Sequence, residues 1–317
     1  MKSPFYLLDC ALALAVLMVV CVPPAQGMEP QTLGVACAFP GELPPLQALL
    51  LPDTAKVKSM EVNGTVFHET DMAGKHLVLF MTGMSVVNAA MTTQLAIDRF
   101  HLDALVFCGI AGAVDPLLQP GDVVVPEAWI HQAEAVWANR KPGTTDQYIL
   151  PKIFKSKWGH FGMMWFDDVY VVQPGQTTPR QVHSFPADPQ LLAAARGAAA
   201  EVRLTRPDGK AAVIKVGGVG MTGPVFLDNR AFREFASRNW GVSVHEMEGT
   251  AVAQVGFVNR LPVLVVRGIS DLAGGQHGFN QEEEFGRAAA RNAAAVTRSI
   301  VDQLLSRPEA AATPSSP

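Results

Sequence analysis

The chain has 317 residues, of which 49% are hydrophobic and 17% are charged. This size and composition allow one large α/β domain to bury a substantial core. The formal net charge is -4 and no basic block is present, so the Lys/Arg cluster that nucleic-acid binding requires is missing. The eight histidines are scattered without metal-ligand spacing, so we expect neither a metal site nor a cofactor.

The N-terminal segment differs from the rest of the chain. Lys2 precedes an apolar run over residues 11–20 that is too short to span a bilayer, and residues 25–27 (Ala-Gln-Gly) suit a cleavage site. We therefore expect residues 1–27 to be a secretory signal peptide, which predicts a secreted or periplasmic protein that leaves the membrane after cleavage. The alternative is an uncleaved anchor, because Asp9 lies unusually close to the apolar run.

Cleavage after residue 27 leaves Cys37 and Cys108 as the cysteines of the mature chain. Both lie in apolar strand-like segments, so two buried thiols are expected rather than a disulfide, although export would permit oxidation. Residues 306–317, rich in Ala, Pro and Ser, are expected to be disordered. The folded domain is therefore predicted to cover residues 28–305.

Strands and helices alternate along this domain. The pattern predicts a three-layer αβα fold with a central mixed, largely parallel sheet. Asn63-Gly64 is a strong hairpin signal. The expected strands are 32–38, two within 57–70, 77–81, 104–108, 123–125, 212–216 and 263–266. The expected helices are 86–100, 189–202, one that carries Phe232 and Phe235 and is capped by Asp228 or Asn229, 248–258 and 282–305.

Three stretches lack such periodicity. Residues 109–113 read as a turn of small residues that lets a ligand or backbone approach closely, and the glycine-dense run 217–224 reads as a mobile or close-approaching loop. Residues 129–186 interleave aromatic residues with Gly, Pro and Lys. They predict an excursion beside the sheet that forms a rim or a subunit contact, or a satellite core under a long loop.

Chemistry-bearing residues gather in two segments near the C-terminus. Residues 244–251 (VHEMEGTA) place two acids around a methionine, and residues 262–271 (PVLVVRGISD) form an apolar strand that ends in Arg, Ser and Asp. The carboxyl ends of parallel strands open into the ligand crevice, so these polar residues are site candidates. The alternative is that Arg267 and Asp271 only cap strand and helix ends.

Four ordered motifs carry a family resemblance. Residues 107–113, 120–125, 246–251 and 265–271 resemble the nucleoside phosphorylase and nucleosidase superfamily, with the closest similarity to 5'-methylthioadenosine/S-adenosylhomocysteine nucleosidases. Each motif alone is weak, but together they cover roughly residues 32–305. The resemblance implies a purine nucleoside as substrate and a homodimer in which an aromatic residue of the partner covers the 5'-group. The candidates for that aromatic residue are Trp137, Trp158 and Phe279.

The resemblance also implies a role for each matching residue. Asp271 would protonate N7 of the departing purine, and Glu248 would bind the ribose hydroxyls. Met247 would pack against the ribose, Arg267 would fix the sugar and the neighbouring acids, and Phe226 would stack on the purine. The other expected binding residues are Ser270, Ala111 and Gly112.

The nucleophile separates the two branches of this superfamily. Its phosphorylases carry a Gly-Asp-Pro-x-Arg turn after the first strand and a further arginine near the middle strands, because phosphate needs fixed cations. Here residues 37–42 (CAFPGE) contain no arginine, and residues 105–108 are apolar. Glu42 would repel phosphate and suits a general base that takes a proton from water. The alternative for Glu42 is a solvated loop acid.

The sequence therefore predicts an exported purine nucleosidase with Glu42 and Asp271 as its catalytic residues. The alternatives are a purine nucleoside phosphorylase and a non-catalytic nucleoside-binding or storage protein of the same fold. Ile110 stands where the nucleosidases usually have Ser or Thr, and both the glycine-dense loop and the 129–186 segment are longer than usual. The base preference and the 5'-substituent stay open for this reason.

Overall fold

The computed structural model describes residues 30–155 and 157–305. The predicted signal peptide (1–27) and the predicted disordered tail (306–317) lie outside the described residues. Within the described part of the chain, no helix combines the length and apolar character needed to cross a membrane.

A mixed, largely parallel sheet of 12 strands forms the centre of the molecule. Its strands are β1 (Thr32–Cys37), β2 (Lys58–Val62), β3 (Thr65–Met72), β4 (Lys75–Met81), β5 (Ala104–Ala113), β6 (Val123–Val125), β7 (Ala128–His131), β15 (Ser184–Pro186), β16 (Ile214–Val216), β17 (Val219–Thr222), β18 (Val242–Glu246) and β19 (Val263–Asp271). The main path runs β15-β7-β17-β18-β5-β1-β4-β3-β2, while β19 pairs with β5 and β6, and β6 pairs with β16. The predicted hairpin joins β2 to β3, and Asn63 and Gly64 adopt the positive φ angles that its tight turn requires.

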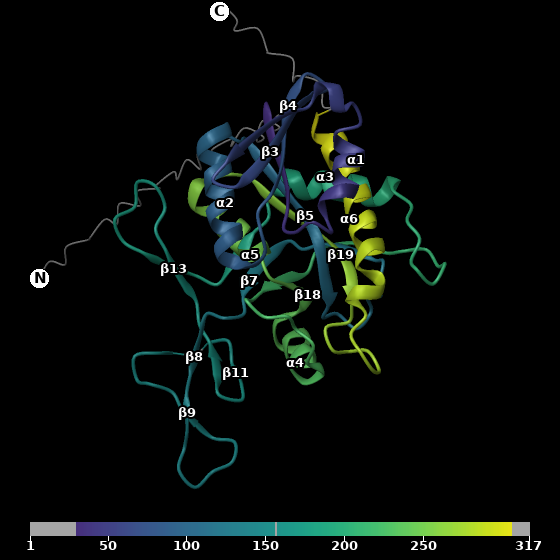
Figure 1. The fold of residues 1–317 in the computed structure, drawn as a ribbon. Coiled ribbons are helices and arrows are strands. Elements are labelled where there is room, and N and C mark those ends of the chain that lie inside the picture. Colours follow the sequence, from purple (N-terminus) through teal and green to yellow (C-terminus); the bar gives the residue numbers. More distant parts are fainter. Residues whose placement is uncertain (1–29, 156, 306–317) are drawn as a thin grey trace, which may run out of the picture.

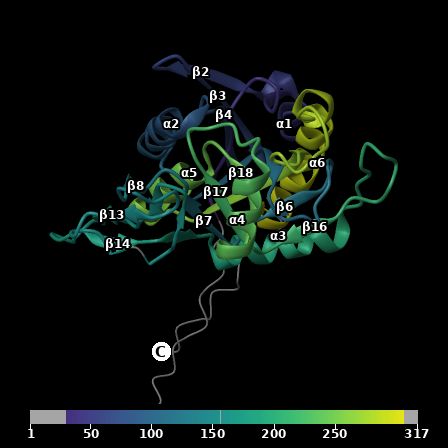
Figure 2. The ribbon, with the colours of Figure 1, turned by 90° about the horizontal axis from the view of Figure 1, so that it is seen from below.

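Helices cover both faces of this sheet, which completes the predicted three layers (Figure 1, Figure 2). They are α1 (Leu43–Leu50), α2 (Ser85–Phe100), α3 (Pro189–Glu201), α4 (Arg230–Trp240), α5 (Gly249–Asn259) and α6 (Glu282–Leu305), with a short 3-10 helix at Thr54–Lys56. Side chains of α2 and α5 pack on one face, and those of α1, α3 and α6 pack on the other. Asn229, one of the two predicted caps, accepts a bond from the Phe232 N–H at the start of α4.

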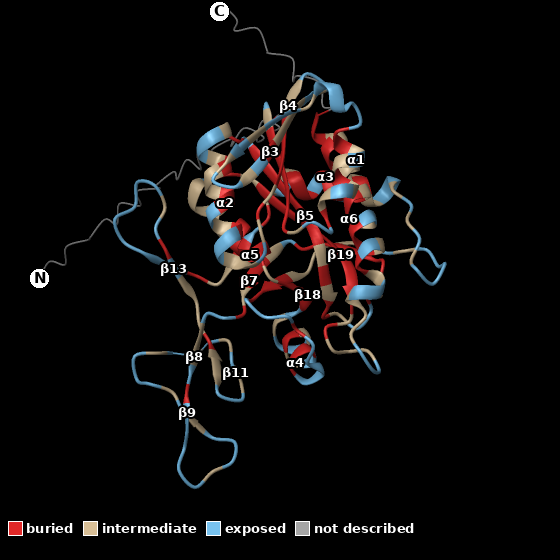
Figure 3. Cartoon of the chain, viewed as in Figure 1, coloured by how far each residue is buried: buried red, intermediate tan, exposed pale blue. Residues whose placement is uncertain are grey.

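Side-chain alternation along the strands builds a separate core on each face. In β1, Leu33, Val35 and Cys37 join the core under α1, α3 and α6, whereas Ala36 faces α2 and α5. An uninterrupted apolar strand is therefore buried on both sides, as parallel sheets require. Figure 3 shows the resulting block of buried residues through the middle of the domain.

Cys37 ends β1, and Cys108 lies within the neighbouring strand β5, each one residue beyond the last pair that the two strands form. Both are buried free thiols in the structure. Burial raises the pKa of Cys108 to about 12 and holds that of Cys37 well above its ordinary value, so neither thiol is activated as a thiolate.

Two strands extend further than the sequence predicted. Residues 109–113, predicted to be a turn, continue β5, and the strand predicted to end at 266 continues as β19 to Asp271. The two extensions pair with each other in parallel, and β18 adds antiparallel bonds to the end of β5. Pairing thus outweighs the low strand propensity of the small residues in 109–113.

The glycine-dense run 217–224, predicted to be a loop, contains β17, which lies between β7 and β18. Close approach explains its glycines, because a Cβ atom on Gly220 would lie 2.6 Å from the ring of Trp129. Helix α1 begins at Leu43, directly after Glu42. Pro44 is tolerated in its first turn, where no intrahelical N–H bond is lost.

Residues 129–186 leave the sheet after β7 and return to it at β15, forming the long excursion at the lower left of Figure 1. Its short strands are β8 (Ala135–Trp137), β9 (Asn139–Arg140), β10 (Tyr148–Ile149), β11 (His160–Phe161), β12 (Met164–Phe166), β13 (Val169–Val171) and β14 (Arg180–Val182). Phe161 and Phe166 pack against Phe232, Phe235 and Trp240 of α4. Part of the aromatic content therefore forms a satellite core, the second of the two roles considered.

Candidate active site

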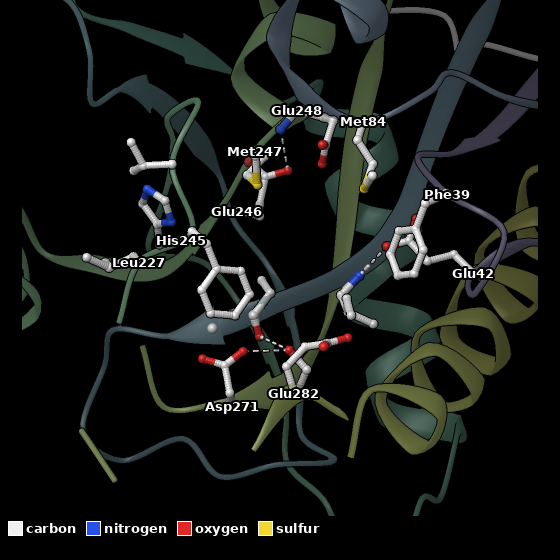
Figure 4. Close-up of a pocket in the computed structure, with 16 residues that line it drawn as sticks. Phe39, Glu42, Met84, Leu227, His245, Glu246, Met247, Glu248, Asp271 and Glu282 are labelled. Atoms are coloured by element: carbon white, nitrogen blue, oxygen red, sulfur yellow. Dashed lines mark hydrogen bonds between the residues drawn. The ribbon is translucent and has the colours of Figure 1, made fainter. Parts of the chain in front are cut away.

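A cavity of about 320 Å³ opens where the end of β18 meets β5 and β19. Both predicted catalytic acids, Glu42 and Asp271, line it from different walls (Figure 4). The other sequence-predicted residues that line the same cavity are Glu248, Met247, Ser270, Phe226, Ala111 and Gly112. Arg267 lies behind the wall, fully buried.

Glu42 stands at the N-cap of α1, but its side chain turns away from that helix and back toward the sheet. One carboxylate oxygen accepts the Ala38 N–H at 2.7 Å, and the other accepts the Ile110 N–H at 2.8 Å. Burial raises the pKa of this carboxyl, although Arg267 and the backbone donors act in the opposite direction. Glu42 is thus a buried, positioned acid, which excludes the solvated loop acid considered from the sequence.

Gly109 gives this carboxylate its space. A Cβ atom at that position would lie 2.4 Å from Glu42 Oε1 and 1.9 Å from Arg267 Nη1. Because Gly109 has no side chain, the Glu42 carboxylate and the Arg267 guanidinium can both lie directly against β5 at this point.

Arg267 organises the acids from behind the cavity. Its guanidinium forms an ion pair with Glu246, lies 3.8 Å from Glu248 Oε2 and sits over the ring of Phe107 at 4.4 Å from the centroid. A buried cation of this kind offsets the cost of placing carboxylates in a dry site. Arg267 fixes the neighbouring acids, as the resemblance implied, but it does not itself face the cavity.

Glu248 accepts the Ser85 N–H at 2.6 Å, so the start of α2 holds it in place. Its pKa is raised to about 7, first by burial and then by the nearby charge of Glu246, and these two effects outweigh the attraction of Arg267. Glu248 is therefore poised to change protonation near neutral pH.

Asp271 is held from three directions. Its Oδ1 accepts the Ala273 N–H at 2.8 Å and an amide N–H of Asn280 at 3.2 Å, and its Oδ2 accepts the Ser270 hydroxyl at 2.8 Å. Gly112 leaves room for it, since a Cβ atom there would lie 2.8 Å from Asp271 Oδ1. Ser270 and Gly112 thus position the acid.

The match to a model of known families extends over nearly the whole described domain, residues 32–302. The chain belongs to the phosphorylase superfamily. It is 28% identical over 275 residues to the 5'-methylthioadenosine/S-adenosylhomocysteine nucleosidase of Mycobacterium tuberculosis, an alignment that covers 84% of this chain and 96% of that protein.

Solved structures share the fold. The structure of 5'-methylthioadenosine/S-adenosylhomocysteine nucleosidase from Helicobacter pylori, in complex with a substituted pyrrolidinol, superposes with a TM-score of 0.64 at 22% identity. The match covers 86% of this chain and 98% of that one. Futalosine hydrolase from the same organism gives a TM-score of 0.62 at 21% identity with the same coverage. These likenesses confirm the predicted fold.

The cavity of this phosphorylase-superfamily chain is lined by five carboxylates and by no lysine or arginine among the described residues. The acids are Glu42, Glu246, Glu248, Asp271 and Glu282. In the same described part, no group of three or more His, Cys, Asp or Glu side chains is arranged to hold a metal ion. The site therefore presents negative charge to its ligand, with the compensating cation kept behind the wall.

Sequence reasoning left out Glu246 as a site residue, although it belongs to a motif that was recognised. Glu246 accepts the N–H groups of Glu248 and Gly249 at 3.1 and 2.7 Å, along with the hydroxyl of Thr222, so it caps the start of α5 while facing the cavity. The sequence did contain a signal for Glu246. It is the last residue of a buried strand, and a second acid, Glu248, follows two residues later.

Ile110 was noted as standing where the nucleosidases usually have Ser or Thr. The remaining lining residues were missed: Phe39, Met84, Val225, Leu227, His245 and Glu282. Most of them come from loops and helix starts, where no periodicity marks them. His245 is bonded to Gln132, and burial lowers its pKa to about 3, so it contributes a neutral ring. Phe226 is 59% exposed and stands at the mouth of the cavity.

Proposed function

We propose that this chain is a purine nucleosidase, which hydrolyses the N-glycosidic bond of a purine nucleoside through an oxocarbenium-like transition state. The supporting observation is that Glu42, Glu248 and Asp271 converge on one cavity, each held by backbone N–H groups. Binding alone does not require acids on different sides of one ligand, whereas glycosidic bond cleavage does.

The acids divide the reaction between them. Asp271 donates a proton to N7 of the purine as the bond from C1' to N9 breaks, so the base leaves neutral. The positive charge left on C1' and O4' is stabilised by the surrounding carboxylates, and Glu248 accepts a hydrogen bond from a ribose hydroxyl. Glu42 takes a proton from a water molecule whose oxygen bonds to C1', which yields the free sugar.

The charge of the cavity favours water over phosphate. A phosphate dianion would enter beside several carboxylates, and Arg267 is too deeply buried to reach it from behind the wall. Fixed cations are what phosphate sites use to offset such repulsion. Hydrolysis is therefore the better proposal than phosphorolysis.

The experiment incubates the mature protein with adenosine, inosine, methylthioadenosine and S-adenosylhomocysteine, with and without phosphate, and separates the sugar products. A free sugar formed without phosphate, either ribose or its 5'-substituted form, supports hydrolysis. The corresponding sugar 1-phosphate formed only with phosphate would make the chain a phosphorylase. Purine binding without any base release would make it a binding or storage protein. Glu42→Gln should abolish most turnover, and Glu61→Gln, an exposed glutamate of β2, is the matched control.

Export is part of the proposal. It rests on the apolar run at 11–20 and the small residues at 25–27, and it favours salvage of nucleosides outside the cytoplasm. Mass spectrometry of the protein released from cells that express the full chain tests it. A mature N-terminus at Met28 supports export with cleavage, whereas an intact Met1 in a cell-retained protein contradicts it.

A homodimer completes the proposal. A groove between α2 and α5 is lined mostly by apolar residues, and two of them, Val87 and Met91, are exposed. Met84 lies just before these residues and also lines the cavity, so a second copy docked on this face would border the active site. Light scattering of the wild type against Met91→Asp tests it, and a monomeric wild type would remove the dimer.

The aromatic residue supplied by a partner would then come from an exposed position. Trp137 is 67% exposed and Phe279 is 96% exposed. Trp158 instead stacks on His183 and donates its ring N–H to Asp168 at 2.6 Å, so it is already engaged within its own chain. Trp137 and Phe279 are the better candidates.

A further inference from the structure

The reaction described above assigns no individual step to Glu246 or Glu282, and Glu246 already forms an ion pair with Arg267. Glu282 begins α6, and its side chain lines the cavity next to Asp271 (Figure 4). Each of the other four acids accepts at least one backbone N–H group. Within the described residues, no donor forms a hydrogen bond or ion pair with the Glu282 carboxylate, so its bonding capacity is directed at solvent or at a ligand.

The place of Glu282 in the cavity follows from its neighbours. Its Oε1 and the Ile110 Cδ1 lie 2.9 and 3.6 Å from the point where a Cβ atom on Gly286 would stand, so the two side chains meet over that glycine. The Ile110 N–H in turn holds Glu42. Glu282 and Ile110 therefore lie on the stretch of wall between Asp271 and Glu42, and Figure 4 shows Glu248 on the facing side.

This arrangement relates Glu282 to the substrate, provided that the proposed nucleosidase function holds. With the ribose hydroxyls on Glu248 and the purine on Asp271, the opposite edge of the sugar carries O4' and C5'. We propose that Glu282 is a specificity-determining residue that accepts a hydrogen bond or ion pair from the 5'-substituent. The favoured ligands are purine nucleosides with a donor at the 5' position, a hydroxyl or an amine, over those with an apolar 5'-thioether.

The energetics agree with this assignment. Burial and the neighbouring charges of Asp271 and Glu283 raise the pKa of the Glu282 carboxyl, so its ionised form is disfavoured. A donor or cation from the ligand relieves that cost, whereas an apolar thioether removes water from the carboxylate and returns no bond. The same side chain therefore attracts one class of nucleoside and rejects the other.

The test compares adenosine, 5'-amino-5'-deoxyadenosine and methylthioadenosine as substrates of the wild type, Glu282→Gln and Glu282→Leu. Both kcat/KM and the dissociation constant are measured for each pair. In Glu282→Leu, the preference for the amino compound over methylthioadenosine should fall by about 10-fold or more. Glu282→Gln should keep the hydroxyl compound but lose much of the preference for the amine, because it accepts a hydrogen bond without carrying charge.

Glu284→Leu is the matched control, since it changes an exposed glutamate in the same turn of α6. An equal loss for all three compounds, or an unchanged ratio, would overturn the specificity role of Glu282. If the wild type releases no base from any compound, the proposed nucleosidase function fails. The ratio of dissociation constants still decides what Glu282 recognises in that case, so the two failures are distinguishable.

Discussion

The floor of the cavity, with Glu42, Glu246 and Asp271, and its mouth, with Phe226 and Glu282, are built in different ways. At the floor, Glu42 and Glu246 are buried, each accepts two backbone N–H groups, and Arg267 neutralises them from behind. At the mouth, Phe226 is largely exposed and Glu282 has no donor among the described residues. Backbone groups of strand ends and helix starts therefore fix the floor, whereas single side chains shape the mouth.

This difference separates chemistry from selectivity. A buried charge network is costly to break, because removal of one member leaves another without its partner in a dry environment. An exposed side chain at the mouth is replaced at little cost to the fold. Floor substitutions should therefore change turnover or stability, and mouth substitutions should change which nucleoside is preferred.

The floor is tested most strongly by Asp271→Asn. The amide accepts the Ala273 N–H but has no acidic proton for the purine, so kcat should fall by about 10²–10⁴-fold while the dissociation constant changes little. Single-turnover assays and calorimetry measure the two quantities. Asp146→Asn, in an exposed part of the 129–186 excursion, is the control. Full turnover in Asp271→Asn would remove the acid from the mechanism.

The second test concerns the cation behind the floor. Arg267→Met leaves Glu246 buried without its ion-pair partner, so the free energy of unfolding should fall by about 3–5 kcal/mol. Urea denaturation measures it. Adding Glu246→Gln should restore part of the loss, because the double variant buries one unpaired charge fewer than Arg267→Met alone. A loss below about 1 kcal/mol in the single variant would mean that the pair contributes little.

The third test uses pH. Because the pKa of Glu248 is raised to about 7, the folded state binds more protons than the unfolded state above the ordinary pKa of a glutamate. Stability should therefore fall as pH rises from about 4.5 to about 7. Glu248→Gln removes this slope, so it should exceed the wild type in unfolding free energy at pH 8, on the order of 1–3 kcal/mol, and match it more closely at pH 5. If the unfolding free energies of Glu248→Gln and wild type depended on pH in the same way, burial would not raise the pKa of Glu248.

The sequence predicts well where local pattern and long-range pairing agree. The alternation of strands and helices indicated the three layers, Asn63-Gly64 marked the hairpin, and the last helix was expected at its observed limits of 282–305. Glycine-rich strands were missed because their glycines make room for side chains that are distant in the sequence. Gly109 makes room for Glu42 and Arg267, and Gly220 lies under Trp129.

The same distinction applies to the site. Acids that end a buried strand or follow it were identifiable from sequence, because such strands share one edge of the sheet. Phe39, Met84 and Glu282 come from a loop and from two helix starts, and only the tertiary packing brings them to the cavity. The floor was thus predictable except for Glu246, whereas at the mouth Phe226 was predicted and Glu282 was not. The substrate preference depends on this less predictable part of the cavity.

The smallest expected effect lies at the mouth. Phe226→Ala should raise KM by about 2–10-fold through lost stacking on the purine and leave kcat and the melting temperature nearly unchanged, because the ring is already mostly exposed. Steady-state kinetics and thermal denaturation measure these values. Phe279→Ala is the informative comparison, since its ring is more exposed and does not line the cavity of its own chain. If only Phe279→Ala raises KM, the purine is covered by the loop that carries Phe279 and not by Phe226. That loop would reach the cavity either by closing over it or from a second copy of the chain.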